Sequence, residues 1–108
     1  MWNEPSKERL NQMPSLYSTQ DTPLQKKEVW LHFFIGGCDW WAVEFDHEGG
    51  DIFFGFVIGF EPEFGYFSLS ELESVRGPLG LPIERDLHFK PKSLEELRDH
   101  YRDNGYAL

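Results

Sequence analysis

The chain has 108 residues, which is the length of one domain and excludes a two-domain enzyme with a separate cofactor module. Hydrophobic residues make up 40% of it and charged residues 27%, which is typical of a folded globular protein. Ten basic against 19 acidic side chains give a net charge of −9, which argues against a protein that binds nucleic acid or an anionic membrane through its own charge. The polar start, the lack of a long apolar run and the single cysteine predict a cytoplasmic protein without disulfides.

The first 14 residues are polar, contain two prolines and show no sustained periodicity. We predict a flexible N-terminal arm, or a short frayed helix, over residues 1–14. The more apolar remainder, with no repeat and no linker, predicts a single α+β domain over residues 15–108.

Glycines and turn residues divide the middle of the chain into short apolar runs, which is typical of antiparallel strands. We predict four strands, over residues 28–35, 38–46, 51–59 and 64–68. Gly36-Gly37 and Gly49-Gly50 tolerate the positive φ of tight turns, so the first three strands should form a meander. A short edge strand at 87–89 would be the fifth.

Two serine capping boxes predict two short helices after the fourth strand. Ser68 lies three residues before Glu71, and Ser93 lies three residues before Glu96. Apolar residues follow each serine at helical spacing, and Asn104-Gly105 would end the second helix. The predicted fold class is therefore α+β, an antiparallel meander of four to five strands with one or two short helices.

Neither face of this predicted sheet is polar. A two-residue turn register gives one face a predicted aromatic core of Trp41, Val43, Phe45, Phe54 and Phe56. The same register places Trp40, Glu44 and Asp46 together on the opposite face. Either the arm and the Pro-rich loop cover this second face, or a partner or the second subunit of a homodimer does.

The acidic charge is concentrated in the predicted sheet. Between Glu28 and Val75 there are ten acidic residues and no Lys or Arg, whereas the other 60 residues hold nine acidic and ten basic side chains. Such a field attracts basic surfaces, including those of proteins that bind nucleic acid. The alternative is that the charge serves solubility alone.

We place the partner-binding surface on one aromatic and six acidic residues of this region: Trp40, Glu44, Asp46, Glu48, Asp51, Glu61 and Glu63. Aromatic side chains are enriched at the centre of interfaces, which favours Trp40 as the anchor. Glu61 and Glu63 would be contacts at the rim.

The sequence predicts no catalytic site, no metal and no cofactor. The cluster at 46–51 lacks the Glu that ends an EF-hand loop, because Val57 stands at that position, and the histidines have no zinc spacing. Ser68 and Ser70 lack a nucleophile elbow. His32 alternates into an apolar strand and is expected to be a hydrogen-bonded core histidine. We therefore expect a protein that is not an enzyme, with a small enzyme carrying an acidic metal site as the least favoured alternative.

Four segments carry distinctive motifs: LYSTQDTPL at 16–24, FGFVIGFEPE at 54–63, GYFSLSEL at 65–72 and RGPLGLPIERDL at 76–87. Between Leu16 and Leu97, about three quarters of the chain, this pattern resembles a family of small plasmid- and phage-borne proteins known only as a domain of unknown function. The resemblance assigns no activity to particular residues. It implies a mobile-element setting, in which small acidic proteins often protect the element from host defence.

The last motif also has a physical interpretation. The loop at 77–86 is either pinned over the sheet by Leu79, Leu81 and Ile83 or shaped for recognition, because loops on rigid scaffolds commonly carry binding.

We therefore expect an acidic inhibitor from a mobile element, which blocks a nucleic-acid-binding host defence effector such as a CRISPR nuclease or a restriction enzyme by direct contact. Its partner would be a basic protein, and the chain itself would bind neither nucleic acid nor membrane. An oligomeric structural or adaptor module is the alternative.

Overall fold

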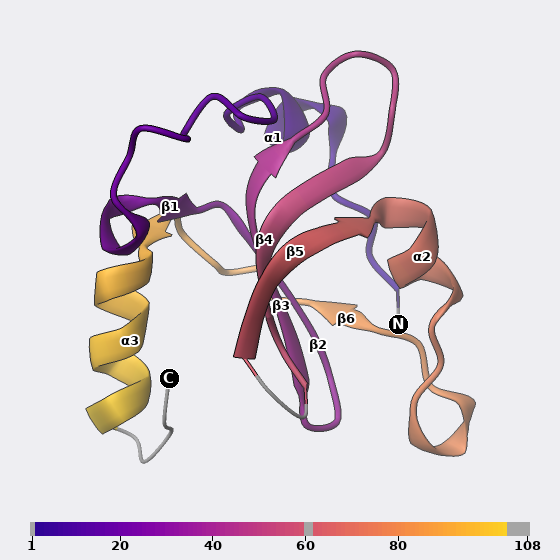
Figure 1. The fold of residues 1–108 in the computed structure, drawn as a ribbon. Helices are drawn as coiled ribbons and strands as arrows, with labels where there is room; N and C mark the ends of the chain where they lie inside the picture. The colour runs from indigo at the N-terminus through magenta and orange to yellow at the C-terminus, as the bar shows by residue number, and fades with distance from the viewer. Residues whose placement is uncertain (1, 60–61, 104–108) are drawn as a thin grey trace.

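The computed structural model describes residues 2–59 and 62–103. At its centre is an antiparallel sheet with the strand order β5-β4-β3-β2-β6 (Figure 1). Its strands are β2 (Leu31–Ile35), β3 (Cys38–Phe45), β4 (Ile52–Ile58), β5 (Pro62–Ser68) and β6 (Glu84–Arg85). A separate pair joins β1 (Glu28–Val29) to β7 (Lys92–Ser93). The helices are α1 (Lys7–Asn11), α2 (Leu69–Ser74) and α3 (Leu94–Asp103), with 3-10 turns η1 (Leu24–Lys26) and η2 (Pro78–Gly80). The predicted α+β class and antiparallel sheet are confirmed.

Both helices predicted from serine capping boxes form. Ser68 Oγ accepts a hydrogen bond from the Glu71 amide at 3.0 Å, and the Glu71 carboxylate accepts one from the Ser68 amide at 3.3 Å. At the start of α3, Ser93 Oγ accepts from the Glu96 amide at 3.2 Å. The predicted helix end at Asn104-Gly105 lies outside the described residues.

The predicted strand at 28–35 is divided in two. Val29 pairs with Lys92 of β7, whereas β2 pairs with β3 and β6. Trp30 lies between the two strands, and its amide donates to the Ala42 carbonyl at 2.8 Å. The first part of the run thus joins a different sheet, which no local pattern indicated.

The fifth strand does not lie at 87–89, as predicted, but at Glu84–Arg85. The Asp86 amide donates to the His32 carbonyl at 3.0 Å, and the Phe89 amide then donates back to the Asp86 carbonyl at 3.3 Å. This turn takes residues 87–89 away from the sheet edge.

A β-bulge in β3 interrupts the alternation of side chains across the sheet. The pairing with β4 is regular through Ala42, skips Val43 and resumes at Glu44. Because a bulge inserts one extra residue into one strand, the side chains beyond it change faces. Trp41 and Phe45 were expected on one face, yet they belong to different core clusters.

Apolar side chains are packed on both faces of the sheet. The first cluster comprises Leu10, Met13, Leu31, Phe33, Ala42, Phe45, Phe53, Phe67, Leu69, Leu72 and Ile83. The second comprises Val29, Trp41, Val43, Phe89, Leu94 and Leu97. The first cluster draws on α1 and α2 and the second on α3, so α2 and α3 lie on opposite sides of the sheet (Figure 1).

The N-terminal segment supplies part of the first cluster. The Trp2 ring stacks on Phe33 with centroids 5.9 Å apart, and Leu10 and Met13 are buried. The arm predicted over residues 1–14 is thus packed on the sheet in the structure. The sequence left open whether the arm and the Pro-rich loop or a partner covers the second face; in the structure, the arm and Ile83 of the loop pack on it.

The predicted aromatic core is correct for Trp41, Val43 and Phe45, which are buried, and wrong for Phe54 and Phe56, which are half-exposed. The buried phenylalanine of β4 is Phe53, whose ring contacts Phe33, Phe45 and Phe67. The sheet face that was expected to be the main core therefore leaves its β4 aromatics partly in solvent.

We expect Phe53→Ala to lower the free energy of unfolding by about 3–5 kcal/mol, because removing a fully buried ring leaves a cavity. Phe54→Ala, the matched change at the next position, should cost about 1 kcal/mol, since that ring is only partly buried. Urea denaturation followed by circular dichroism measures both values. Equal losses would contradict the assignment of the two faces.

Candidate functional site

The structure separates Trp40 from Glu44, which were predicted to share one binding face. Trp40 is half-buried and packs against the first cluster. Glu44 pairs with Phe54, lies on the opposite face and has only 3% of its surface exposed. The predicted juxtaposition is wrong, because the bulge in β3 reverses the faces between these two residues.

Of the other predicted acidic residues, two accept hydrogen bonds from nearby backbone amides and two are exposed to solvent. The Asp46 carboxylate accepts from the Glu48 amide at 2.8 Å, and the Asp51 carboxylate accepts from a backbone amide of α2 at 3.0 Å. Glu48 and Glu63 are exposed. Glu61 lies outside the described residues.

The Glu44 carboxylate is held by the segment that precedes η1. Its Oε1 accepts from the Tyr17 amide at 2.8 Å, and its Oε2 accepts from the Thr19 amide at 3.2 Å and from the Thr19 hydroxyl. Lys27, also buried, donates to the carbonyl and hydroxyl oxygens of Thr19. Thr19 therefore links two buried opposite charges, which can be tolerated inside a protein when they are hydrogen-bonded.

A pocket of about 230 Å³ opens above this carboxylate. Its lining consists of Tyr17, Gln20, Lys27, Glu44, Phe54 and Tyr66. The Tyr17 and Tyr66 rings are 58% and 55% exposed, and their centroids lie 6.3 Å apart. The pocket thus has charged groups at its base and aromatic rings at its mouth.

The pKa of the Tyr66 hydroxyl is shifted by the groups around the mouth of the pocket. Partial desolvation, a hydrogen bond with the Tyr17 side chain and the charges of Tyr17 and Glu44 raise the pKa of Tyr66 above its ordinary value. The negative charge of Glu44 is therefore felt at the rim of the pocket.

The aromatic rings continue from the pocket along β4 and β5. The Phe64 centroid lies 6.2 Å from that of Phe54 and 4.8 Å from that of Phe56, and Phe64 is itself exposed. We call this surface the aromatic face, made of Tyr17, Phe54, Phe56, Phe64 and Tyr66. Contiguous exposed apolar surface of this kind marks interaction sites.

Sequence reasoning placed no member of the aromatic face on the binding surface: Phe54 and Phe56 were predicted as core, and no role was predicted for Tyr17, Phe64 and Tyr66. A signal was present for two of them, because Phe64 and Tyr66 are two residues apart in a strand and must share a face. Tyr17 gave no such signal, because it is brought to this surface by a hydrogen bond between its amide and Glu44, 27 residues further along the chain.

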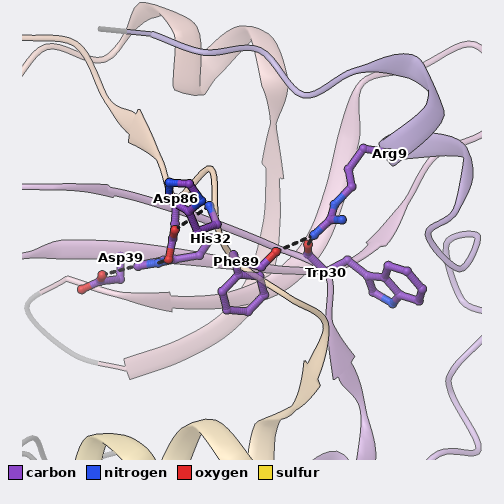
Figure 2. Close-up of polar contacts among 7 residues, drawn as sticks. Arg9, Trp30, His32, Asp39, Asp86 and Phe89 are labelled. Carbon is purple, nitrogen blue, oxygen red and sulfur yellow. Dashed lines mark hydrogen bonds and ion pairs between the residues drawn. The ribbon is translucent and has the colours of Figure 1, made fainter.

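His32 is the centre of a second polar cluster (Figure 2). Its Nε2 lies 2.7 Å from Oδ1 of Asp39, and its Nδ1 lies 4.0 Å from Oδ2 of Asp86. The imidazole stacks on Trp41 with centroids 3.7 Å apart. These contacts join β2 and β3 to the turn after β6, as expected for a hydrogen-bonded core histidine.

A shallow hollow of about 520 Å³ lies beside this cluster. Its lining consists of His32, Phe34, Asp39, Arg85, Asp86, Leu87 and His88. This set contains no Ser, Thr or Cys, so the hollow does not bring a hydroxyl or thiol nucleophile to the imidazole.

Arg9 connects α1 to the same region (Figure 2). Its Nη2 donates to the Trp30 carbonyl at 3.2 Å and to the Phe89 carbonyl at 2.8 Å. Because Trp30 is the residue between β1 and β2, this guanidinium holds the chain where the predicted long strand divides. We assign the contacts of Figure 2 to the architecture of the fold.

In the part of the chain whose side chains the structure describes, no three His, Cys, Asp or Glu converge as metal ligands. The helices of that part of the chain include none that is both long and apolar enough to cross a membrane.

A family described as "Protein of unknown function (DUF2958)" matches residues 8–105. The chain belongs to this family. The resemblance to a family known only as a domain of unknown function is thereby confirmed. No curated protein and no solved structure matches the chain. The function of this DUF2958 protein must therefore be argued from its surface.

The loop before β6 is a second exposed apolar feature of the DUF2958 protein. Leu79 is 97% exposed and has a positive φ of 61°, and Leu81 is exposed as well. Ile83 is fully buried in the first cluster. Three residues were expected to hold this loop on the sheet. Of these, only Ile83 does so, because Leu79 and Leu81 are exposed to solvent.

Asp51 gives this DUF2958 protein a pH-dependent contribution to stability. The Ser70 hydroxyl and amide donate to the carboxylate and hold the pKa of Asp51 below its ordinary value. A group whose pKa is lowered on folding stabilises the fold above its unfolded pKa of about 3.9, and this contribution is lost as the pH falls through the folded pKa.

We therefore expect Asp51→Asn to lower the free energy of unfolding at pH 7 by less than about 1 kcal/mol, since solvent screens a part-exposed carboxylate. The difference from the unaltered chain should shrink as the pH falls below about 4. Urea denaturation at several pH values measures it. Glu48→Gln, at an exposed position of the neighbouring hairpin, is the matched control, and a loss that stays constant with pH would contradict the assignment.

Proposed function

We propose that this protein is an acidic inhibitor from a mobile element that blocks a basic, nucleic-acid-binding effector of host defence by direct contact. The observation that carries the proposal is the aromatic face, in which Tyr17, Phe64 and Tyr66 are exposed and Phe54 and Phe56 are partly exposed. Four of these five rings lie in the region between Glu28 and Val75, which contains no Lys or Arg. The contact surface is centred on this face and not on Trp40.

The aromatic face has the composition of an interface centre. Tyr and Phe are enriched there because they bury a large area while few torsions are immobilised. Phe54 of β4 contacts both Phe64 and Tyr66 of β5, so the rings are already arranged before a partner arrives. A preformed surface of this kind lowers the entropy cost of association.

The exposed acidic side chains of the sheet region favour a basic partner. Glu48 is exposed in the hairpin that precedes β4, and Glu63 is exposed on the edge strand β5, where its side chain points to the face opposite that of Phe64. Proteins that bind nucleic acid carry Lys and Arg on the surface that contacts phosphate. An acidic protein that docks on such a surface competes with the nucleic acid for the same groups.

The contacts favour binding over catalysis. The Glu44 carboxylate already accepts three hydrogen bonds from Tyr17 and Thr19, and the lining of the hollow beside His32 supplies no hydroxyl or thiol nucleophile.

A homodimer or adaptor role would use the same exposed rings, but a net charge of −9 opposes association of two copies. Light scattering, which measures the mass of the particle in solution, distinguishes a dimer from a single chain.

The test begins with an affinity pull-down from a host lysate that identifies the effector, followed by surface plasmon resonance at several salt concentrations. We expect Tyr66→Ala to raise the dissociation rate roughly 10- to 100-fold, as loss of an interface anchor does. Glu63→Lys should slow association and flatten its dependence on salt.

Leu79→Ala is the matched control, because Leu79 is an exposed apolar residue outside the aromatic face. It should leave both rates unchanged. If Leu79→Ala weakens the complex while Tyr66→Ala does not, the interface lies on the loop at 77–86 and the proposed surface is wrong.

The proposal also requires that the protein itself has no affinity for nucleic acid. We expect no binding of double- or single-stranded DNA or of RNA at physiological salt, because the acidic sheet region repels phosphates. Fluorescence anisotropy with labelled oligonucleotides measures this. Micromolar binding would contradict the proposal and would direct attention to Lys90, Lys92 and Arg98.

A further inference from the structure

The pocket above Glu44 combines a carboxylate at its base with aromatic rings at its mouth. Tyr17 and Tyr66 flank the opening, and Phe54 contacts Tyr66 with ring centroids 5.2 Å apart. A guanidinium is planar, permanently charged and rich in donors, and it both stacks on rings and binds carboxylates. Resting on the proposed function, we infer that this pocket receives an arginine side chain of the basic partner.

The base of the pocket retains capacity for such a ligand. A carboxylate offers about four acceptor positions, and the described residues fill three of those on Glu44. Two of the three bonds come from the backbone of Tyr17 and Thr19, so the carboxylate is fixed in place. A guanidinium that enters the pocket meets an oriented acceptor and gains a charge-assisted hydrogen bond.

Lys27 also lines the pocket, but its ammonium is not paired directly with Glu44. Its ammonium donates to the carbonyl and hydroxyl oxygens of Thr19, and that hydroxyl stands between Lys27 and Glu44. The influence of Glu44 extends to the Tyr66 hydroxyl, where it contributes to a raised pKa. A cation that enters between the two tyrosines is therefore attracted by Glu44 and repelled by Lys27, and its bond to the carboxylate must outweigh that repulsion.

The size of the pocket fits one side chain. Its volume of about 230 Å³ lies below the range of roughly 300–1,000 Å³ that is typical of sites for drug-sized molecules. Arginine is favoured over lysine, because an ammonium is strongly hydrated and cannot stack its charged group on Tyr17, Tyr66 or Phe54 as a planar guanidinium does.

The test is an NMR titration of the isotope-labelled protein with N-acetyl-arginine amide, up to about 50 mM, since fragments bind in the millimolar range. We expect saturable shifts of the Tyr17 and Thr19 amides, which donate to Glu44, and of the Tyr66 amide. N-acetyl-citrulline amide, neutral and nearly isosteric, should bind at least about tenfold more weakly. Equal responses to the two probes, equal affinity for N-acetyl-lysine amide, or no response would overturn the assignment.

Two variants locate the site on the protein. Tyr66→Ala removes an exposed wall at little cost to folding and should weaken binding of the arginine probe about tenfold. Glu44→Gln removes the charge at the base and should abolish the saturable shifts, with the amide spectrum as the folding check. Glu63→Gln, which neutralises an exposed carboxylate outside the pocket lining, is the matched control and should leave probe binding unchanged.

The outcomes separate this inference from the proposed function. If the arginine probe does not bind, but Tyr66→Ala and Glu63→Lys still weaken the effector complex, the arginine assignment is wrong and the proposed function stands. If Glu63→Gln weakens probe binding as much as Glu44→Gln does, net charge alone attracts the probe and the pocket assignment is wrong.

Discussion

The β-bulge at Val43 is the constraint on which the two faces of the sheet depend. It turns Phe45 toward Phe53 and the first cluster, and it turns Glu44 toward Phe54 on the opposite face. Gly55 permits this geometry, because a Cβ at that position would lie 2.0 Å from the Trp41 carbonyl oxygen. The close approach of β3 and β4 beside the bulge therefore requires a residue without a side chain.

Burying Glu44 has a consequence for the chain that precedes the sheet. An unpaired carboxylate in that position would be strongly destabilising, so the amides of Tyr17 and Thr19 must be held against it. The same bonds carry the Tyr17 ring to Tyr66, where the two rings form the mouth of the pocket. The position of Tyr17 in the aromatic face thus follows from the need to satisfy one buried charge.

Local signals in the sequence were sufficient for the elements but not for the faces. The capping boxes at Ser68 and Ser93 and the glycine turns are short-range features, and the elements they predict are present. The sequence of residues 41–45 carries no mark of the bulge, so a regular register was assumed across it and Glu44 was predicted on the same face as Trp40. Gly55, isolated inside an aromatic strand, was the one local sign of a bulge, while the pairing of β1 with β7 joins segments more than 60 residues apart and has no local sign.

The negative charge of the protein limits self-association through the exposed aromatic face. An edge strand such as β5, with Phe64 and Tyr66 exposed beside it, is a template for pairing with other chains unless charge prevents it. Glu63 on that strand and the net charge of −9 repel a second copy, whereas a basic surface is attracted by the same field. Solubility and recognition are therefore not competing explanations of the charge. Under the proposed function, the carboxylates that repel a second copy of this chain would also favour contact of those rings with partners of opposite charge.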